Sequence, residues 1–579
     1  MTVVDLNQHA ELRIRKAIAR LDAAGSELGS LVLERPRDAS HGDLGFPCFQ
    51  LAGQLERKPA ELARDLAERI EPDAVIAQAE ARGPFLNLRW QRAALAESVV
   101  RGVLEDAPPF GPWPRSGKHV VIDFSSPNIA KPFHIGHLRS TVIGAALRRL
   151  YMHAGYEVHG INHLGDWGAQ FGKIIVAWRE WGDETRLEAD PMRHLFEIYV
   201  RYQEEEGSRP ELLERSAEAF QRLESGEDNE ERALWNKLRQ VSLDAFAGPY
   251  GRLGVEFDAI TGESFYEDKM EGTIRAIQDA GAASLSEGAL VVDLREEGLP
   301  PCMLRKSDGT TIYATRDLAA LFYRRETYRF DRALYVVGSE QKLYFRQLKL
   351  VLKKLGWPEA DSVEHVDFGM ILFRNQETGR WEKGKTRSGN VIFLSEVLDE
   401  AVEKIRSIIE QKNPDLPDKQ EVAEKIGVSA IIFNDLKNGR IKDVKFDWEE
   451  MLSFDGETGP YVQYAGARLA SILRKAGSDS ARPSRADPAY EKLADADSVL
   501  LTMLEFGPVL RRAIDKNEPS LLTQLMVRTA STIHGYLRDH HVLSAEEPTR
   551  TARLALVTAS RKLLRTGLGL LGVASPDEM

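Results

Sequence analysis

The sequence feature that most constrains this chain is a short strand followed by a polar loop and a helix. Residues 119–124 are rich in β-branched side chains, as in a buried strand, and apolar residues recur at helical spacing from Leu138 to about His153. The loop between them, residues 125–137, brings two histidines and a glycine to the N-terminus of the helix. Unpaired amides and the helix dipole favour an anion at that position, so the pattern predicts a phosphate site.

Strands and helices alternate after this unit. Residues 156–163 predict a second strand, which ends at the glycine-rich turn 164–172, and the alternation resumes at 311–317, 332–341 and 364–372. A strand, a helix and a strand in succession imply a parallel pair, and open α/β sheets bind ligands at the carboxyl ends of such strands. We therefore expect an α/β fold with a Rossmann-like parallel-sheet central domain.

The segments on either side of this domain differ from it in pattern. The first block combines helical periodicity with a loop-rich middle and a closing strand, which predicts an α+β domain, and a proline-rich linker follows it. The last part of the chain is almost wholly helical, which predicts an all-α end. The expected domains are 1–112, 113–398 with an insertion at about 178–295, 399–454 as a helical connection that carries the end of the core, and 455–579.

Two groups of polar residues allow both a functional and a structural interpretation. His41 and Asp43 flank Gly42 in a turn, where a hydrogen-bonded loop is favoured over catalysis. The acidic run 204–206 lies in the charged helices of the expected insertion, and it is interpreted as a solvated face.

Composition argues against several classes of protein. No segment approaches the roughly 18 apolar residues of a membrane span, and the first residues lack a basic leader, so we expect neither membrane insertion nor export. The two cysteines, Cys48 and Cys302, are far apart and form no Cys-x-x-Cys motif, which favours a reducing cytoplasm and predicts no metal site. The net charge, 77 basic minus 89 acidic residues or −12, argues weakly against a general nucleic-acid coat.

Residues 381–390 form a second polar loop, called here the cation loop. Lys383, Lys385 and Arg387 place three cations in five positions of it. A loop of this kind can close over polyphosphate. The tip of an ordinary basic hairpin is an equally good interpretation of the loop taken alone.

An ordered set of motifs runs through the chain. Its members are Ser125, Pro127, Asn128, Ala130, Lys131 and His134 to His137; Gly165 to Gly168 with Gln170 to Gly172; Tyr313 to Asp317; Val337, Gly338 and Gln341; Lys383 to Asn390; and Thr458 to Ala465. Together they resemble the arginyl-tRNA synthetases of class I. The resemblance covers nearly the whole chain, with residues 1–112 similar to the family's N-terminal tRNA-binding domain and residues 455–579 similar to its anticodon-binding domain.

The resemblance implies an arginine–tRNA ligase, which activates L-arginine with ATP, releases pyrophosphate and transfers arginine to the 3′-terminal adenosine of tRNA(Arg). ATP is then a substrate, Mg²⁺ is expected to accompany it, and activation is expected to need tRNA. The expected protein is a cytoplasmic monomer. Two alternatives stay open: a catalytically silent tRNA-binding relative, and a nucleotidyltransferase that acts on a small molecule.

The resemblance also assigns roles to residues. The first signature is His134 to His137, and the region around it comprises Pro127, Asn128, Ile129, Ala130, Lys131, Pro132, Phe133, His134, Ile135, Gly136 and His137. The expected catalytic residues are Lys131, His134, His137, Lys383, Lys385 and Arg387, and the expected ATP contacts are His134, Gly136, His137, Gly338, Met370 and Lys385. The cation loop departs from the usual Lys-Met-Ser-Lys-Ser pattern of class I enzymes, and Lys131 matches a lysine that many family members carry before the first signature.

Selection of arginine calls for a carboxylate, because the guanidinium fork pairs with it bidentately and lysine cannot imitate that geometry. Asp317 is the candidate, although Asp317 or Thr315 could equally cap a helix. By resemblance, arginine would also contact Asn128, His137, Tyr313 and Gln341. Tyr344 stands where the family often has histidine, and it receives no role.

Basic residues on two C-terminal helices predict a phosphate-binding surface with little base specificity. They are Arg468, Arg474, Lys475, Arg561, Lys562 and Arg565. By resemblance, tRNA would meet Tyr464, Tyr536 and the chain end at Met579. For both tyrosines, core packing with a satisfied hydroxyl is an open alternative.

Overall fold

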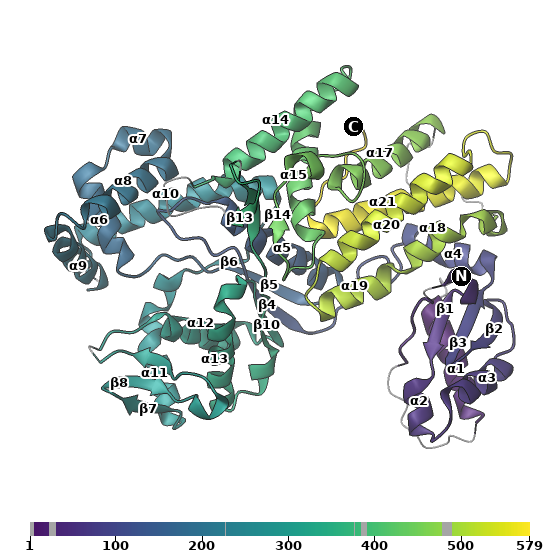
Figure 1. Cartoon of the computed structure of the whole chain (residues 1–579), viewed down its shortest axis with the longest axis horizontal. Helices are drawn as coiled ribbons and strands as arrows, with labels where there is room; N and C mark the ends of the chain where they lie inside the picture. Colours follow the sequence, from purple (N-terminus) through teal and green to yellow (C-terminus); the bar gives the residue numbers. More distant parts are fainter. Residues whose placement is uncertain are drawn as a thin grey trace.

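The structure is a computed structural model of the 579-residue chain and describes residues 5–21, 31–36, 38–225, 227–307, 309–375, 377–383, 391–477 and 489–579. The molecule is elongated, with a helical lobe at one end and the N-terminal domain at the other, beside the C-terminal helices (Figure 1). Among the described residues, no helix is both apolar enough and long enough to cross a membrane.

A five-stranded parallel sheet forms the centre of the molecule. Its strands, in spatial order, are β11 Val363–His365, β10 Arg332–Tyr335, β4 His119–Asp123, β5 Glu157–Asn162 and β6 Ala259–Ile260. All neighbouring pairs are parallel, which confirms the predicted fold class. Because β5 lies on one side of β4 and β10 on the other, the strand order reverses beside β4. Such a reversal opens a crevice at the carboxyl ends of the two strands.

Helix α5, Leu138–His153, follows β4 and is buried on nearly all sides. It lies between the sheet and helices of the C-terminal half, which explains why its sequence lacks a continuous polar face. Gly144 is needed there, because a Cβ atom would lie only 2.3 Å from Phe124. The helix therefore rests directly on the end of β4.

The residues between β5 and β6 form the helical lobe. Its helices are α6 Gln170–Trp181, α7 Glu184–Ala189, α8 Pro191–Glu205, α9 Glu211–Glu224 and α10 Glu230–Leu253. The segment expected to be an insertion thus also contains β6, whose two residues are too few to show a periodic pattern. The chain then forms η3 Glu263–Lys269, α11 Met270–Asp279, the antiparallel sheet of β7 Ala283–Ser286, β8 Ala289–Val292 and β9 Cys302–Arg305, and α12 Tyr313–Tyr328.

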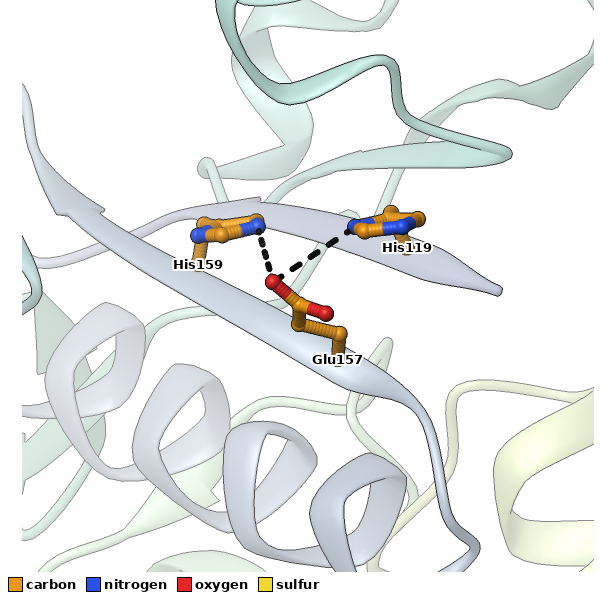
Figure 2. A group of neighbouring side chains, drawn as sticks. All are labelled: His119, Glu157 and His159. Atoms are coloured by element: carbon orange, nitrogen blue, oxygen red, sulfur yellow. Dashed lines mark ion pairs between the residues drawn. The ribbon is translucent and has the colours of Figure 1, made fainter. Parts of the chain in front are cut away.

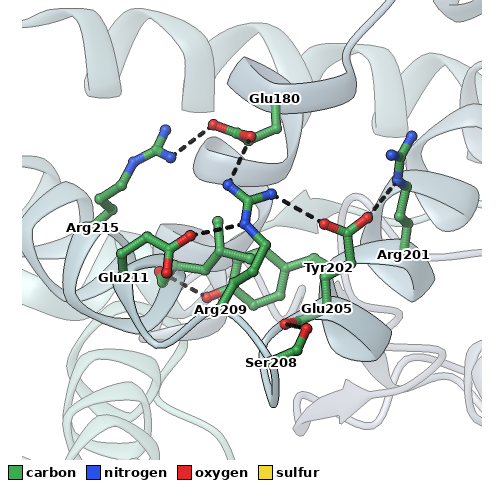
Figure 3. A network of polar contacts seen from close by, with 9 residues as sticks. Glu180, Arg201, Tyr202, Glu205, Ser208, Arg209, Glu211 and Arg215 are labelled. Atoms are coloured by element: carbon green, nitrogen blue, oxygen red, sulfur yellow. Dashed lines mark hydrogen bonds and ion pairs between the residues drawn. The ribbon is translucent and has the colours of Figure 1, made fainter.

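Ion pairs organise the charged surface of the lobe (Figure 3). Arg209 contacts Glu180, Glu205 and Glu211, and its Nε lies 2.8 Å from Oε1 of Glu211. Glu205, which belongs to the acidic run, also pairs with Arg201 at 2.9 Å. Hydrogen bonds from Arg201 and Arg209 lower the pKa of Glu205. The acidic run is therefore part of a network that joins α6, α8 and α9, and it is not only a solvated face.

The N-terminal domain has an antiparallel sheet in the order β1-β3-β2. Its elements are α1 Leu6–Ala19, β1 Leu44–Pro47, α2 Phe49–Gln54, α3 Pro59–Arg69, β2 Ile76–Arg82, β3 Phe85–Trp90 and α4 Arg92–Leu104. Asp43 accepts hydrogen bonds from the Trp90 amide at 2.9 Å and from Arg92 at 2.7 Å, which supports the structural interpretation of this loop. Arg92 also pairs with Asp497 at 2.9 Å, so α4 is tied to the C-terminal helices.

The remaining elements complete the C-terminal half. They are α13 Lys342–Lys354, β12 Ile371–Arg374, β13 Trp381–Lys383, α14 Leu394–Lys412, α15 Lys419–Leu436, β14 Val444–Lys445, α16 Trp448–Met451, α17 Gly459–Lys475, α18 Asp497–Leu504, α19 Phe506–Asp515, α20 Ser520–Asp539 and α21 Thr549–Leu571. Strand β12 pairs with β13 and β14 in a small sheet. From α17 onward the regular elements of the described residues are helices, which confirms the predicted all-α end.

A buried ion pair fixes α5 against α15. Nε of Arg139 lies 2.7 Å from Oδ1 of Asp435, and both side chains are 2% exposed. Arg139 also donates a hydrogen bond to the Lys442 carbonyl at 2.8 Å. Burial raises the pKa of Asp435, and the adjacent guanidinium opposes that rise. The pair joins the first turn of α5 to the segment that leads into β14.

Replacing Asp435 with alanine should destabilise the protein strongly. Loss of one partner leaves a buried, uncompensated charge on Arg139, at a cost of about 3–5 kcal/mol. The measurement is the midpoint of urea unfolding. The matched control is Asp577→Ala, which removes an ion pair of similar length with Arg561 at the surface (2.6 Å) and should cost no more than about 1 kcal/mol. Similar midpoints for the two variants would contradict the role given to the buried pair.

Candidate active site

The loop that follows β4 has an unusual backbone. Ser125, Ser126 and Ala130 have φ angles of 72°, 51° and 55°, in the left-handed region that side chains disfavour. Buried hydrogen bonds hold this conformation: the Ser125 amide donates to Ser140 Oγ and the Ala130 amide donates to Ser242 Oγ, both at 2.9 Å. Because Ser242 lies on α10, the helical lobe supports the loop. A strained backbone that several surrounding contacts hold in place is typical of functional sites.

His134 and His137 cap reciprocally the short 3-10 helix η2, Ile135–His137, which leads directly into α5. Nδ1 of His134 accepts a hydrogen bond from the Gly136 amide at 3.0 Å, and Nδ1 of His137 accepts one from the His134 amide at 3.2 Å. A Cβ atom on Gly136 would lie 2.7 Å from the His134 ring, so only glycine lets the ring fold back. The two imidazole centroids are 4.0 Å apart.

Both imidazoles are neutral at physiological pH. Burial lowers the pKa of His134, and burial together with the neighbouring His134 lowers the pKa of His137 to about 3. Because each Nδ1 accepts a hydrogen bond, the proton of each neutral ring resides on Nε2. The pair therefore offers two N–H donors at the N-terminus of a helix, an arrangement that suits phosphate oxygens.

A cavity of about 370 Å³, called here the nucleotide cavity, opens beside these histidines. It collects residues that the sequence places far apart, and five of the predicted ATP-binding or catalytic residues line it. They are His134, Gly136, Gly338, Met370 and Lys383. Lys383 pairs with Glu340, another lining residue, at 3.2 Å, and both side chains are more than half exposed.

Lys131, another predicted cation, is not among the lining residues. Nζ of Lys131 donates a hydrogen bond to Gln170 at 2.9 Å and lies over the ring of Tyr199, and burial lowers the pKa of Lys131. Lys385 and Arg387 lie outside the described residues. Which of these cations contacts which phosphate stays a prediction.

Asp317 sits between two polar side chains. The Tyr344 hydroxyl donates a hydrogen bond to one carboxylate oxygen, and Nε2 of His163 lies 3.8 Å from the other. Burial raises the pKa of Asp317, while His163 and Tyr344 oppose that rise. His163 directly follows β5, so the carboxylate reaches the same edge of the sheet as the two signature histidines.

Helix capping does not explain Asp317 or Thr315. The N-cap of α12 is Ile312, and its side chain makes no cap. The Thr315 hydroxyl instead donates a hydrogen bond to a carbonyl of β9. Tyr313 is 57% exposed, and its ring centroid lies 5.0 Å from that of Tyr344. Tyr313 and Asp317 therefore both contact Tyr344.

Asn128 is packed against the glycine-rich turn that follows β5. It forms a parallel bridge with Gly165, and a Cβ atom there would lie 2.0 Å from Oδ1 of Asn128. The adjacent Asp166 is fully buried and accepts a hydrogen bond from Nε of Arg239 at 3.1 Å. The motif thus joins the first signature to α10. Gln341 is exposed at the start of α13.

Sequence reasoning missed several residues around Asp317. Tyr344 was marked only by its departure from the family pattern, and His163 only by its position at the end of a strand. Glu263 gave no signal at all. Burial raises the pKa of Glu263 to about 7, and Arg316, at 3.6 Å, opposes that rise. Asp317 is among the charges that raise it further.

The predicted tRNA contacts differ in exposure. Tyr464 is 47% exposed and stacks on His534 at 5.9 Å. Tyr536 is buried, its hydroxyl lies 3.4 Å from Asp495, and burial raises its pKa to about 12, as the packing alternative predicts. The Met579 carbonyl accepts a hydrogen bond from Asn413 at 3.3 Å.

Part of the predicted basic surface is paired with carboxylates. The pairs are Arg474 with Glu578 at 3.0 Å, Arg561 with Asp577 at 2.6 Å and Lys562 with Asp106 at 2.7 Å. A tRNA phosphate would have to compete with these carboxylates for the cations, which weakens the predicted contribution of this surface.

Three family models match the chain. The model described as tRNA synthetases class I (R), catalytic domain, matches residues 101–448. The arginyl tRNA synthetase N terminal domain matches residues 8–90, and the DALR anticodon binding domain matches residues 462–579. The catalytic model covers more than half of the chain, so the fold and the crevice are those of a class I aminoacyl-tRNA synthetase.

Comparison with individual proteins shows to which family within this class the chain belongs. The chain is 44% identical over 560 residues to an arginine–tRNA ligase of Exiguobacterium sibiricum, covering 96% of this chain and 97% of that protein. It is 46% identical over 551 residues to arginine–tRNA ligase 2 of Bacillus anthracis, with 95% of each covered. The solved arginyl-tRNA synthetase of Thermus thermophilus superposes with a TM-score of 0.82 at 28% identity, covering 99% of this chain and all of that one. The chain belongs to the arginyl-tRNA synthetase family, which confirms the resemblance and the predicted enzyme class.

Two substitutions of His134 should separate its roles as a cap and as a donor. Asparagine keeps an acceptor near the position of Nδ1 but lacks a distal donor, so His134→Asn should keep wild-type thermal stability and lose roughly 100- to 1,000-fold in the rate of arginine activation by ATP. Glutamine keeps a distal N–H but loses the cap, so His134→Gln should lose about 1 kcal/mol of stability and retain more activity. An unchanged rate in His134→Asn would show that His134 acts only as a cap.

Proposed function

We propose that this chain is an arginine–tRNA ligase that forms arginyl-adenylate and pyrophosphate from L-arginine and ATP, then transfers arginine to the 3′-terminal adenosine of tRNA(Arg). The observation that carries this proposal is that a candidate phosphate site and a candidate guanidinium site lie together at the carboxyl ends of β4 and β5. Neutral imidazole donors follow β4, and His163, which follows β5, contacts Asp317. One crevice thus offers groups for a polyphosphate and for a guanidinium.

Adenylation is an in-line displacement at the α-phosphate, so the protein mainly has to position ATP and stabilise charge on the departing pyrophosphate. In this proposal Nε2 of His134 and of His137 donate to phosphate oxygens. Gly338 and Met370 line the place of the nucleotide. Lys383 supplies a cation, and it exchanges Glu340 for phosphate when ATP binds.

Further cations are proposed around the same triphosphate. Lys385 and Arg387 of the cation loop are retained as catalytic residues on the family pattern. Lys131 is retained with them, and its bond to Gln170 implies that a side-chain rotation brings it to the phosphates.

Mg²⁺ is proposed to enter with ATP. Glu340 is the one carboxylate among the described residues that line the nucleotide cavity, and it is paired with Lys383. Mg²⁺ in such enzymes binds substrate phosphates, keeps several waters and needs only one or two carboxylates. The lining fits an ion carried by ATP, and it does not fit a cage of protein ligands.

Arginine is proposed to lie with its guanidinium on Asp317. The Tyr344 hydroxyl favours the ionised form of that carboxylate and fixes its orientation, because it donates to the charged form. Tyr313 and Gln341 would hold the side chain of the substrate. Asn128 and His137 would approach its α-amino and carboxylate groups.

The flanking domains are proposed to bind tRNA(Arg). The division used here is 1–112 for an N-terminal tRNA-binding domain, 113–398 for the catalytic domain, 399–454 for the connection and 455–579 for the anticodon-binding domain. Tyr464 and Met579 are the proposed anticodon-side contacts, because Tyr464 is exposed and Tyr536 is not. We further propose a monomer that works in the cytoplasm, in line with two free, buried cysteines.

Arginine-dependent exchange of pyrophosphate into ATP tests the activity, measured with and without tRNA(Arg). We expect exchange that requires both arginine and the tRNA. A catalytically silent tRNA-binding relative would give no exchange even with tRNA. Exchange supported by a different amino acid, or by a small molecule other than an amino acid, would contradict the assigned substrate.

Asp317→Asn should weaken arginine binding much more than ATP binding. The change removes the charge that faces the guanidinium, and a charged hydrogen bond is worth about 1.5–3 kcal/mol, or roughly 10- to 150-fold in KM for arginine. KM for ATP is the internal control. An unchanged KM for arginine would remove Asp317 from the substrate site.

Tyr344→Phe should shift the pH dependence of arginine binding. Burial raises the pKa of Asp317 and the Tyr344 hydroxyl opposes this, so loss of the hydroxyl raises that pKa further. Arginine needs the ionised carboxylate, so KM for arginine should rise as pH falls through the pKa of Asp317, and it should start to rise at a higher pH in the variant. This pH dependence should be absent in Asp317→Asn. Identical profiles for Tyr344→Phe and the wild type would contradict the role of the hydroxyl.

A further inference from the structure

Two histidines and a glutamate gather at the amino ends of β4 and β5, whereas the crevice lies at the carboxyl ends of these strands. His119 is the first residue of β4, and Glu157 and His159 are the first and third residues of β5. Side chains alternate along a strand, so Glu157 and His159 share a face, and the strand register pairs His119 with Glu157. Figure 2 shows the carboxylate of Glu157 reaching between the two imidazoles.

The donor atoms of these residues converge on one space. Oε1 of Glu157 lies 3.8 Å from Nδ1 of His119 and 3.7 Å from Nε2 of His159, and all three donor atoms lie within 4.8 Å of one another. The imidazole planes are parallel to within 3°. Tetrahedral zinc with bonds of about 2.0–2.2 Å keeps its ligand atoms about 3.3 Å apart, so small side-chain rotations would complete the geometry.

One ring nitrogen of the cluster has no hydrogen-bond partner. Nδ1 of His119 is buried and has none among the described residues. Hydrogen bonding inside the cluster does not account for the arrangement, because N···O distances of 3.7 and 3.8 Å are too long for hydrogen bonds.

We propose that His119, Glu157 and His159 form a binding site for a divalent transition-metal ion, with Zn²⁺ as the best match. Two imidazoles and one carboxylate are a ligand set that zinc uses with a fourth, non-protein ligand. The expectation of a chain without a metal site rested on its two cysteines, and neither of them belongs to this proposed site.

The bound ion would have a structural role. It would clamp the first residues of two adjacent strands, far from the reacting groups at their carboxyl ends. The ring of His159 also packs against Tyr328, the last residue of α12, with centroids 4.6 Å apart. The bound ion would therefore also stabilise the C-terminal end of α12, the helix that carries Asp317 near its N-terminal end.

Titration of the tag-free, full-length chain with Zn²⁺ after treatment with a chelator tests the proposal. Calorimetry should show one bound ion per chain, and Co²⁺ should give the intense visible absorption of a four-coordinate site. The double variant His119→Gln, His159→Gln should lose at least about 10- to 100-fold in affinity for Zn²⁺. That is the loss that follows removal of a residue that only supports a metal ligand. Zn²⁺ should raise the melting temperature of the wild type and not that of the double variant.

His9→Gln is the matched control. His9 pairs with Asp73 at 2.9 Å and belongs to no metal-ligand group among the described residues, so this variant should bind Zn²⁺ like the wild type. If the double variant does not fold, Glu157→Gln replaces it, because Glu157 is 66% exposed and its loss leaves the core intact. Absence of binding by the wild type, or equal binding by the wild type and the ligand variants, would overturn the proposal.

Discussion

The ion pair between Arg139 and Asp435 is the interaction on which the geometry of the crevice depends. It joins the first turn of α5 to α15 across 296 residues of sequence, and both charges are almost fully removed from water. A buried charge is tolerated only when its partner is well placed, so the pair specifies one position of α5 relative to α15. The two signature histidines sit at the start of the same helix and share that position.

The loop before α5 is then fixed from three directions. Its own helix binds it through Ser140, whose Oγ accepts a hydrogen bond from the Ser125 amide, and α10 binds it through Ser242. The turn after β5 binds it through the bridge between Asn128 and Gly165. Positive φ angles are costly for residues with side chains, and here the surrounding contacts over-determine them. A reaction that depends mainly on positioning needs donors held in this way.

The sequence predicted the parts of this arrangement that local patterns encode. Alternating strands and helices predicted the parallel sheet, and the His-x-Gly-His spacing predicted an anion site at a helix start. It could not predict contacts between distant residues, such as Tyr344 with Asp317 or Arg139 with Asp435, because no periodicity encodes them. The same limit left the capping alternative for Asp317 open, and the start of α12 at Tyr313, with Ile312 as its N-cap, excludes it.

A crystal structure with a sulfamoyl analogue of arginyl-adenylate would show whether phosphate and guanidinium occupy two defined halves of one crevice. We expect the guanidinium within hydrogen-bond distance of the Asp317 carboxylate and the group that replaces the phosphate next to Nε2 of His134. A guanidinium bound away from Asp317, or an adenosine outside the cavity lined by Gly338 and Met370, would contradict this expectation.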